Sequence, residues 1–402
     1  MKNAMRIVKT ILILIVALQM AACKGKITVQ EAGLLPQAEN LLSKAIVSEG
    51  NQDRLQRVFA KAVKGEKIVI GVLGGSITEG AACANPDKRY ANVVLAWWKN
   101  TFPKAEFELV NAGIGATGSD YGAMRVKRDL LSKSPDMVVV EYAVNDQNTE
   151  EYAESYEGVV RQILNAPQKP ALMLLFMMRN DGTNAQEWES KIGNHYGLPM
   201  ISYRDALWPE IQAGRIKWVQ ISPDKIHPNE AGHVLTGELI SEALEKAFKK
   251  FSPDNIPTVS ATIPAPFISD NFEFPSLFDG ETLIPRTNLG WVFDGSPGKN
   301  SGWKSSVPGS VLEFEISGTR IYLSCWRLNG PMGKASASVD GGSPVIMDAW
   351  FDQTWGGYRY MLEIGKNLTP GKHIVRIKLL SEKNAQSTGN EFLVLCLGSA
   401  GV

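Results

Sequence analysis

Apolar runs that alternate with helical spacings over residues 66–250 are the strongest constraint on the fold of this chain. The runs at 68–73 and 137–140 are almost continuously apolar, which is typical of strands that helices cover on both faces of a sheet. The stretches between such runs place apolar residues at helical spacing. This order predicts a three-layer α/β/α domain with a mostly parallel sheet.

The expected elements follow one another in regular order. Strands are expected at 67–73, 107–111, 137–142, 171–178 and 200–203, and helices at 90–102, 121–131, 150–164, 185–196 and 229–249. A polar leader and a helical segment, together residues 23–65, precede them. In sheets of this kind the ligand site lies at the carboxyl ends of the strands, so the loops after the strands are expected to carry the chemistry.

The pattern changes near residue 250, and a length of 402 residues is enough for two domains. Closely spaced prolines predict a linker at 251–268. Beyond it, helical spacing disappears and short β-rich runs follow, at 311–316, 320–326, 335–339, 358–364, 373–380 and 391–397. Residues 269–402 are therefore predicted to form an all-β sandwich, similar to a jelly roll, of a kind that suits holding a carbohydrate.

Half of the ten tryptophans lie in this second region, at Trp291, Trp303, Trp326, Trp350 and Trp355. Packing in the core of the sandwich is the expected role of such residues. Trp350 and Trp355 flank Phe351 in a loop-like stretch, where stacking on a sugar is the alternative.

The first 22 residues have the pattern of a signal peptide. Positive charges precede an apolar run at 10–19 that is too short to span a bilayer. The run ends in small residues before Cys23, which resembles the lipobox of bacterial lipoproteins. That resemblance implies lipidation of Cys23 and an exported protein anchored to a bacterial membrane, periplasmic or at the cell surface. A plain secretory signal is the alternative.

Charge and cysteine content exclude two further classes. Lys and Arg number 42 and so do Asp and Glu, which argues against a nucleic-acid partner. The cysteines left after the signal, Cys83, Cys325 and Cys396, fit no zinc spacing. Cys325 and Cys396 lie in apolar runs, where they either form a pair or serve as small core residues.

Residues able to catalyse acyl transfer follow the predicted strands. Ser76 lies in a glycine-rich turn at 74–80, directly after the first strand, where a hydroxyl can be exposed as a nucleophile. Such a hydroxyl needs an adjacent base. Of the four histidines, His227 has Asp224 three residues before it, and that carboxylate can fix the imidazole tautomer. A glycine-rich segment, 111–118, and the segment 143–146 end the second and third strands.

These four segments, in this order, resemble the four sequence blocks of the SGNH (GDSL-like) hydrolase superfamily, whose fold is flavodoxin-like. The resemblance covers about residues 65–250. It implies that Ser76 is the nucleophile, that His227 is the general base and then the general acid, and that Asp224 orients the imidazole. No metal or organic cofactor is implied.

The resemblance also implies an oxyanion hole. Its donors would be the N–H of Ser76, an N–H of the second loop and the side-chain amide of Asn145. Gly115 matches the loop donor best, while a shift of one residue would place it at Ala116. The sequence departs from the family pattern where Gly75 replaces the aspartate of Gly-Asp-Ser, and where alanine replaces the glycine two residues before Asn145.

Other interpretations explain fewer residues. The glycines at 113, 115 and 118 match a dinucleotide-binding fingerprint with Glu141 beyond it, but that interpretation leaves the serine and histidine segments without a role. His227 and His233 have no zinc spacing. Arg179 and Trp188 follow the fourth strand and are candidates for substrate binding, with an ordinary solvated loop as the alternative.

The sequence therefore predicts a serine esterase that hydrolyses O-acyl esters, most simply O-acetyl esters, on a poly- or oligosaccharide through an acyl-enzyme. The carbohydrate substrate comes from the resemblance, because similar two-domain esterases remove acetyl groups from polysaccharides. A lipase or thioesterase with the same site is one alternative. A glycan-binding lipoprotein without catalysis is the other.

Overall fold

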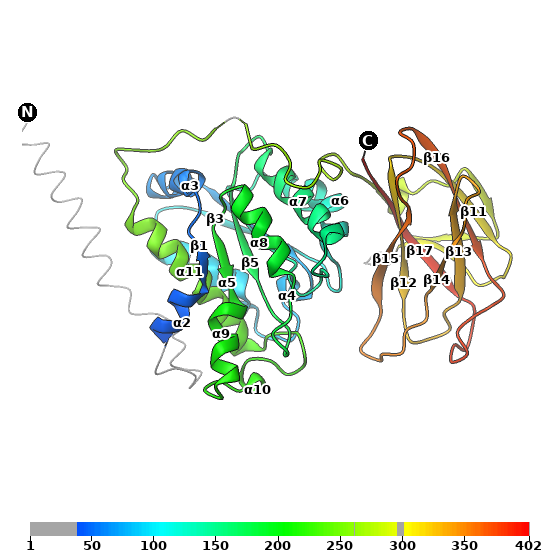
Figure 1. Ribbon diagram of the computed structural model, residues 1–402, viewed down its shortest axis with the longest axis horizontal. Helices are drawn as coiled ribbons and strands as arrows, with labels where there is room; N and C mark the ends of the chain where they lie inside the picture. The colour runs from blue at the N-terminus through cyan, green and yellow to red at the C-terminus, as the bar shows by residue number, and fades with distance from the viewer. Residues whose placement is uncertain (1–37, 261, 296–300, 402) are drawn as a thin grey trace, which may run out of the picture.

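The computed structural model describes residues 38–260, 262–295 and 301–401 (Figure 1). The predicted signal peptide, Cys23 with its predicted lipidation, and the polar leader lie outside the described residues. In the described part of the chain, no helix is both long enough and apolar enough to cross a membrane.

The first domain contains a sheet in the order β1-β6-β5-β4-β2-β3. The parallel strands are β2 (Ile68–Gly74), β3 (Phe107–Gly113), β4 (Met137–Glu141), β5 (Ala171–Phe176) and β6 (Met200–Ser202), and the short β1 (Ile46–Ser48) pairs antiparallel with β6 at the edge. Without β1, the order is that of a flavodoxin-like sheet, whose ligand site lies where the strand order reverses, beside β2. The predicted fold class of this domain is confirmed.

Helices cover both faces of this sheet. The helices are α2 (Ala38–Ala45), α3 (Asp53–Val63), α4 (Ser76–Glu79), α5 (Tyr90–Thr101), α6 (Ser119–Asp129), α7 (Glu150–Leu164), α8 (Gln186–His195), α9 (Tyr203–Gln212), α10 (Trp218–Ile221) and α11 (Glu230–Lys249). One apolar core joins the sheet to α3, α5, α9 and α11, and the other joins it to α6, α7 and α8. The apolar runs of the central strands are therefore buried on both sides.

Four of these helices and strands were not expected from the sequence. The helical segment expected before residue 65 is two helices, because β1 lies between α2 and α3. Three residues are too few to show a strand's alternation. α9 begins where a strand was expected to end, since the Ser202 hydroxyl accepts the Asp205 N–H at 2.9 Å and caps the helix. The other two are the four-residue helices α4, expected only as part of a glycine-rich turn, and α10.

The second domain is a sandwich of two antiparallel sheets, as the sequence predicts. One sheet has the order β15-β12-β17-β10-β9 with β7 also on β17, and the other has the order β14-β13-β16-β11-β8. The bounds are β7 (Ser276–Asp279), β8 (Thr287–Leu289), β9 (Val292–Asp294), β10 (Gly302–Ser305), β11 (Val311–Ser317), β12 (Arg320–Arg327), β13 (Lys334–Val339), β14 (Val345–Asp348), β15 (Tyr358–Gly365), β16 (Lys372–Leu379) and β17 (Phe392–Ala400). The strands missed from the sequence, β7 to β10 and β14, have three or four residues each.

The cysteines of the described chain are free and buried. Cys325 lies on β12 and Cys396 on the neighbouring β17, and both are completely buried. Their neighbours across the strands are Val394 and Ser324, so the two thiols do not face each other as a pair. Of the two roles that the sequence left open, packing in the core is the one observed.

The sheet that contains β15, β12 and β17 faces the α/β domain (Figure 1). Tyr322 and Ala400 of the sandwich belong to the same apolar core as Val126 and Val159 of α6 and α7. Phe272, only 1% exposed, lies between the domains with its ring 5.9 Å from that of Tyr322. The two domains therefore share a core.

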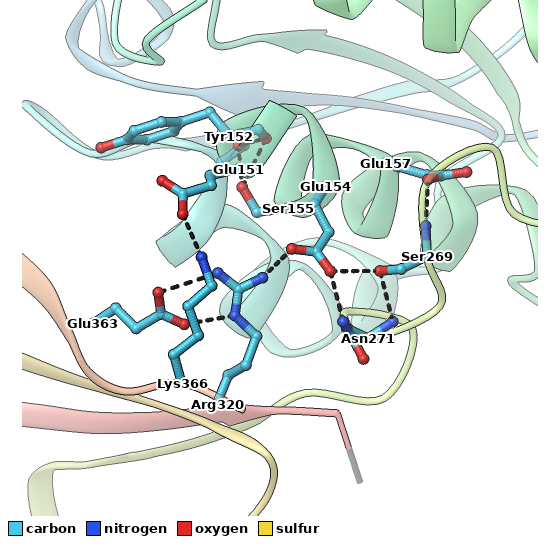
Figure 2. Close-up of polar contacts among 11 residues, drawn as sticks. Glu151, Tyr152, Glu154, Ser155, Glu157, Ser269, Asn271, Arg320, Glu363 and Lys366 are labelled. Atoms are coloured by element: carbon cyan, nitrogen blue, oxygen red, sulfur yellow. Dashed lines mark hydrogen bonds and ion pairs between the residues drawn. The ribbon is translucent and has the colours of Figure 1, made fainter. Parts of the chain in front are cut away.

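Buried charges also connect the domains (Figure 2). Arg320 of β12, whose side chain is 7% exposed, pairs with Glu363 at 2.5 Å and with Glu154 of α7. Glu157 is completely buried and accepts the N–H groups of Phe267 at 2.6 Å and Ile268 at 2.8 Å. The end of the predicted linker is thus bound to α7 and does not act as a free tether.

Replacing Arg320 with alanine should lower the free energy of unfolding by about 3–5 kcal/mol, because Glu154 and Glu363, whose side chains are only 13% and 22% exposed, would then lose their buried cation. Urea unfolding, followed by tryptophan fluorescence, measures the change. Arg376→Ala is the matched control, since the side chain of Arg376 is 49% exposed in its pair with Glu313, and its loss should stay below about 1 kcal/mol. Equal losses in the two variants would contradict this role of Arg320.

Candidate active site

The turn between β2 and α4 presents Ser76. β2 ends at Gly74, and Ser76 is the first residue of α4. Gly75 lies between them, where a Cβ atom would come within 2.2 Å of the Asn145 Oδ1. An aspartate at position 75, usual in the family that the sequence resembles, would collide with this amide. The glycine therefore allows the turn after β4 to approach the nucleophile turn.

The structure brings together the three residues that the sequence singled out. The Ser76 hydroxyl lies 2.9 Å from His227 Nε2, and His227 Nδ1 lies 2.8 Å from Asp224 Oδ2. This chain of contacts joins residues that are 151 positions apart in the sequence. An imidazole held on one nitrogen by a carboxylate can take a proton on the other.

The segment of Asp224 and His227 is held by its own hydrogen bonds. The Ser222 hydroxyl donates to the carbonyls of Asp224 at 2.9 Å and of His227 at 2.7 Å. Just beyond, Asn229 caps α11 by accepting the Gly232 N–H at 3.0 Å. The imidazole therefore stands at the entrance to a capped helix, as the sequence indicated.

The Asp224 carboxylate is stabilised in its charged form. Partial burial opposes ionisation, but two backbone N–H groups, those of His227 and Ile226, each donate to Asp224 Oδ1 at 2.7 Å. Together with the imidazole they outweigh burial and lower the pKa of Asp224 below its usual range. A charged carboxylate is what an imidazole needs beside it when it becomes protonated.

Asn145 lies in a tight turn at the end of β4. The Tyr142 carbonyl accepts the N–H groups of Asn145 at 2.8 Å and of Asp146 at 2.9 Å. The Asn145 Oδ1 is buried against Gly75 and has no hydrogen-bond partner among the described residues. The Nδ2 is then the atom of this amide that can donate to a ligand, as the sequence predicts for an oxyanion hole.

The glycine-rich loop after β3 packs against the nucleophile turn. At Gly113 a Cβ atom would come within 2.2 Å of the Glu79 nitrogen. The Gly115 N–H donates to Glu79 Oε2 at 2.9 Å. Glu141, which a dinucleotide site would need at a ribose, is completely buried. The glycines serve close packing of two loops, and the dinucleotide interpretation remains without support.

Buried carboxyl groups below the Asn145 turn were missed by sequence reasoning. Glu141, Asp146 and Glu189 are at most 1% exposed. Burial raises the pKa of Glu141 to about 8 and raises the pKa values of the other two. Asp146 Oδ1 accepts the Ser119 N–H at 2.8 Å, which ties the turn to the start of α6. Asp146 follows Asn145 in the sequence, but no local signal marks Glu189.

Arg179 and Trp188, the candidates for substrate binding, make contacts within the protein. The Arg179 guanidinium donates to the Val144 carbonyl, so it braces the Asn145 turn. Trp188 is partly buried against the core of the domain, and the Lys191 ammonium lies 3.8 Å from its ring centroid. Their role toward a substrate stays a prediction.

The other histidines have structural contacts. His233 is buried, accepts the Tyr90 N–H on Nδ1 at 3.3 Å and has its Nε2 3.3 Å from the Ala81 carbonyl. Burial lowers its pKa to about 4. His195 contacts the Ala265 carbonyl, and His373 pairs with Asp340 in the sandwich. Across the residues that the structure covers, no three His, Cys, Asp or Glu side chains form a group that could hold a metal ion.

Comparison with known proteins finds relatives over both domains. The model of the GDSL-like Lipase/Acylhydrolase family matches residues 72–235. Two crystal structures of a two-domain esterase active on acetylated mannans are similar to this chain over both domains. One, co-crystallised with mannopentaose, has 34% identity and a TM-score of 0.83, and the other has 33% identity and a TM-score of 0.84. Each match covers 90% of this chain and 98% of the esterase.

The chain belongs to the GDSL-like lipase/acylhydrolase family. As a member, it is an ester hydrolase with an SGNH-type α/β domain and a C-terminal β-sandwich. The family resemblance inferred from the sequence is thereby confirmed. No curated protein sequence matches the chain.

His233 should make this hydrolase less stable in acid. The unfolded imidazole takes up a proton below about pH 6.5, whereas the buried one stays neutral until about pH 4. The contribution of the neutral His233 to the free energy of unfolding is therefore fully present above pH 6.5. It is lost as the pH falls toward 4, by about 3 kcal/mol in all. Urea unfolding at pH 7 and pH 4.5 should show a smaller acid loss in His233→Gln. The exposed His195→Gln is the control, and equal pH dependence in all three proteins would contradict the prediction.

Proposed function

We propose that this hydrolase is a serine esterase that removes acyl groups, most simply acetyl groups, from a carbohydrate through an acyl-enzyme. The observation that carries the proposal is the chain of contacts from Ser76 through His227 to Asp224, with the Asn145 amide beside the nucleophile turn. A hydroxyl with a base at 2.9 Å, and a base oriented by a carboxylate, is the arrangement that activates serine.

The reaction would run in two acyl transfers. The Ser76 Oγ attacks the ester carbonyl carbon while His227 Nε2 takes the hydroxyl proton. The tetrahedral intermediate then expels the sugar alkoxide, which receives that proton from Nε2 and leaves as an alcohol. A water molecule next gives its proton to Nε2 and attacks the acyl-enzyme, and the proton returns to Ser76 as the carboxylic acid departs. Asp224 holds the protonated imidazole in both halves.

The negative charge of each tetrahedral intermediate needs preorganised donors. In this proposal the donors are the N–H of Ser76 at the start of α4, an N–H of the loop after β3 and the Asn145 amide. Neutral donors held in advance cost no reorganisation, and each is worth about 10²–10³ in rate.

Similarity and surface chemistry support a carbohydrate substrate. The relatives that align over both domains act on acetylated mannans. The sandwich of this chain carries an aromatic cluster of Phe351, Trp355 and Tyr358, with ring centroids 5.0–5.6 Å apart. Trp350 is buried, as core packing predicts, but Trp355 is 61% exposed. An exposed aromatic face of this size suits stacking on a sugar ring.

The position of this cluster fits a substrate that contacts both domains. Tyr358 begins β15, which lies on the side of the sandwich toward the α/β domain (Figure 1). The next residue, Arg359, holds its guanidinium 4.9 Å from the ring of Tyr121 on α6. The export and the lipid anchor at Cys23, which the sequence predicts, are part of this proposal. They would place the enzyme in the periplasm or at the cell surface, where it can reach polysaccharides.

Ser76→Ala should lower kcat/KM for 4-nitrophenyl acetate by at least about 10³, because the residual catalysis comes only from binding and the oxyanion donors. Acetate should be the fastest ester of a series from acetate to decanoate, and acetylated mannan should release acetate. Ser132→Ala is the control, since this serine precedes β4 at the opposite end of the sheet. A preference for decanoate would favour a lipase, and no turnover of any ester or acetylated glycan would favour a binding protein.

Trp355→Ala should raise KM for acetylated mannan about 3- to 10-fold and leave kcat/KM for 4-nitrophenyl acetate unchanged, because a stacking contact is worth about 1 kcal/mol. Trp355→Phe should keep most of the affinity. Phe274→Ala is the matched control, since that ring is 78% exposed elsewhere on the surface. If Trp355→Ala leaves KM for acetylated mannan unchanged, the aromatic cluster does not bind the substrate.

A further inference from the structure

Glu79 is a carboxylate beside the nucleophile that neither the triad nor the proposed reaction uses. It is the last residue of α4, the short helix that Ser76 begins. Its Oε2 accepts the Gly115 N–H at 2.9 Å, a contact that joins the nucleophile turn to the loop after β3. A Cβ at position 115 would lie 2.9 Å from this oxygen and 3.8 Å from the Ser76 Cβ. Glycine at 115 therefore admits the carboxylate.

This contact changes which group of the loop can stabilise an oxyanion. The Gly115 N–H is already bonded to a carboxylate in the resting protein. The next N–H along the chain is that of Ala116, and no acceptor for it lies among the described residues. Preorganised donors act without first breaking a bond. The Ala116 N–H meets this condition, and the Gly115 N–H does not.

The backbone at Ala116 has the strain that is expected where a loop is held for function. Its φ is +55°, in the left-handed region that costs a non-glycine residue about 1 kcal/mol. Such a conformation persists only where contacts on both sides impose it. On one side stands the Glu79 contact, and on the other the Thr117 hydroxyl donates to the Ile114 carbonyl at 2.7 Å.

We propose that Glu79 is a positioning residue that fixes the loop after β3, and that the Ala116 N–H, not that of Gly115, is the loop donor of the oxyanion hole. The inference rests on the proposed acyl-enzyme reaction and deepens it. Glu79 acts through the loop and does not touch the reacting atoms.

The charge of Glu79 and its hydrogen bond have opposite effects, and this separates them in experiment. A carboxylate near a developing oxyanion disfavours the transition state electrostatically. Its oxygen, in contrast, holds the loop in the conformation that presents the donor. Glu79→Gln keeps an acceptor oxygen and removes the charge, whereas Glu79→Ala removes both.

With 4-nitrophenyl acetate, Glu79→Ala should lower kcat about 10- to 100-fold and leave KM within about twofold, because the lost contact matters only when the oxyanion forms. Glu79→Gln should retain at least the wild-type kcat. An arylboronic acid, which forms a tetrahedral anion on Ser76, should bind Glu79→Ala more weakly by a similar factor. Glu66→Ala is the control for removing an acid, since Glu66 is 48% exposed in a weak ion pair with Lys64.

A second experiment removes single N–H groups. Incorporation of the α-hydroxy acid analogue of alanine at 116 replaces that N–H by an ester oxygen and should lower kcat about 10²–10³-fold. The corresponding glycine analogue at 115 should cost less, about as much as Glu79→Ala. Circular dichroism melting confirms that each variant is folded.

Several results would overturn the proposal. A rise in KM alone in Glu79→Ala would indicate that Glu79 binds substrate. A rise in kcat would indicate that its charge destabilises the transition state more than its contact with the loop helps. A larger loss from the ester at 115 than at 116 would assign the donor to Gly115. If the proposed acyl-enzyme reaction itself is wrong, Ser76→Ala will retain activity. That result does not depend on the Glu79 variants, so the two failures can be distinguished.

Discussion

The register of β2 between β3 and β4 is the constraint on which the site depends. Gly74 pairs with Gly113 on one side and with Glu141 on the other. The three strands therefore end side by side, and the turns that follow them, from Ser76, Gly115 and Asn145, meet at one edge of the sheet. A slip of two residues would carry a turn about 7 Å along the strand and away from the other two. The burial of β2 and β4 holds this register, while β3 is the partly exposed strand at the edge of the sheet.

Much of this arrangement is readable in the sequence because it depends on local patterns. Apolar runs predict the buried strands to within a few residues, and the helix expected from residue 229 places His227 just before its start. The pairing of Asp224 with His227 follows from a spacing of three residues. The contact between Ser76 and His227, 151 positions apart, has no local signal. It was predicted only because four segments in order resemble a known family.

The features that sequence reasoning missed depend on distant parts of the chain. β1 and β7 to β10 are too short to show alternation, and their partner strands define them. Nothing near Arg320 indicates that it lies buried between Glu154 and Glu363. The same holds for Glu189, whose burial beneath the Asn145 turn is a property of the packed domain. Likewise, the bond from Gly115 to Glu79 appears only when two loops are placed together.

Gly75 and Glu79, at the two ends of the nucleophile turn, explain each other. Family members with aspartate at the position of Gly75 have a side chain there that braces the loop. Here the Asn145 amide fills that space, since a Cβ at position 75 would come within 2.2 Å of its oxygen. A carboxylate brace must then come from another position, and Glu79 supplies one, four residues on, directed at the loop after β3. The glycine lets the turn after β4 approach Ser76 and the glutamate binds the loop after β3, so both residues serve one requirement, that two separate loops be fixed around a single serine.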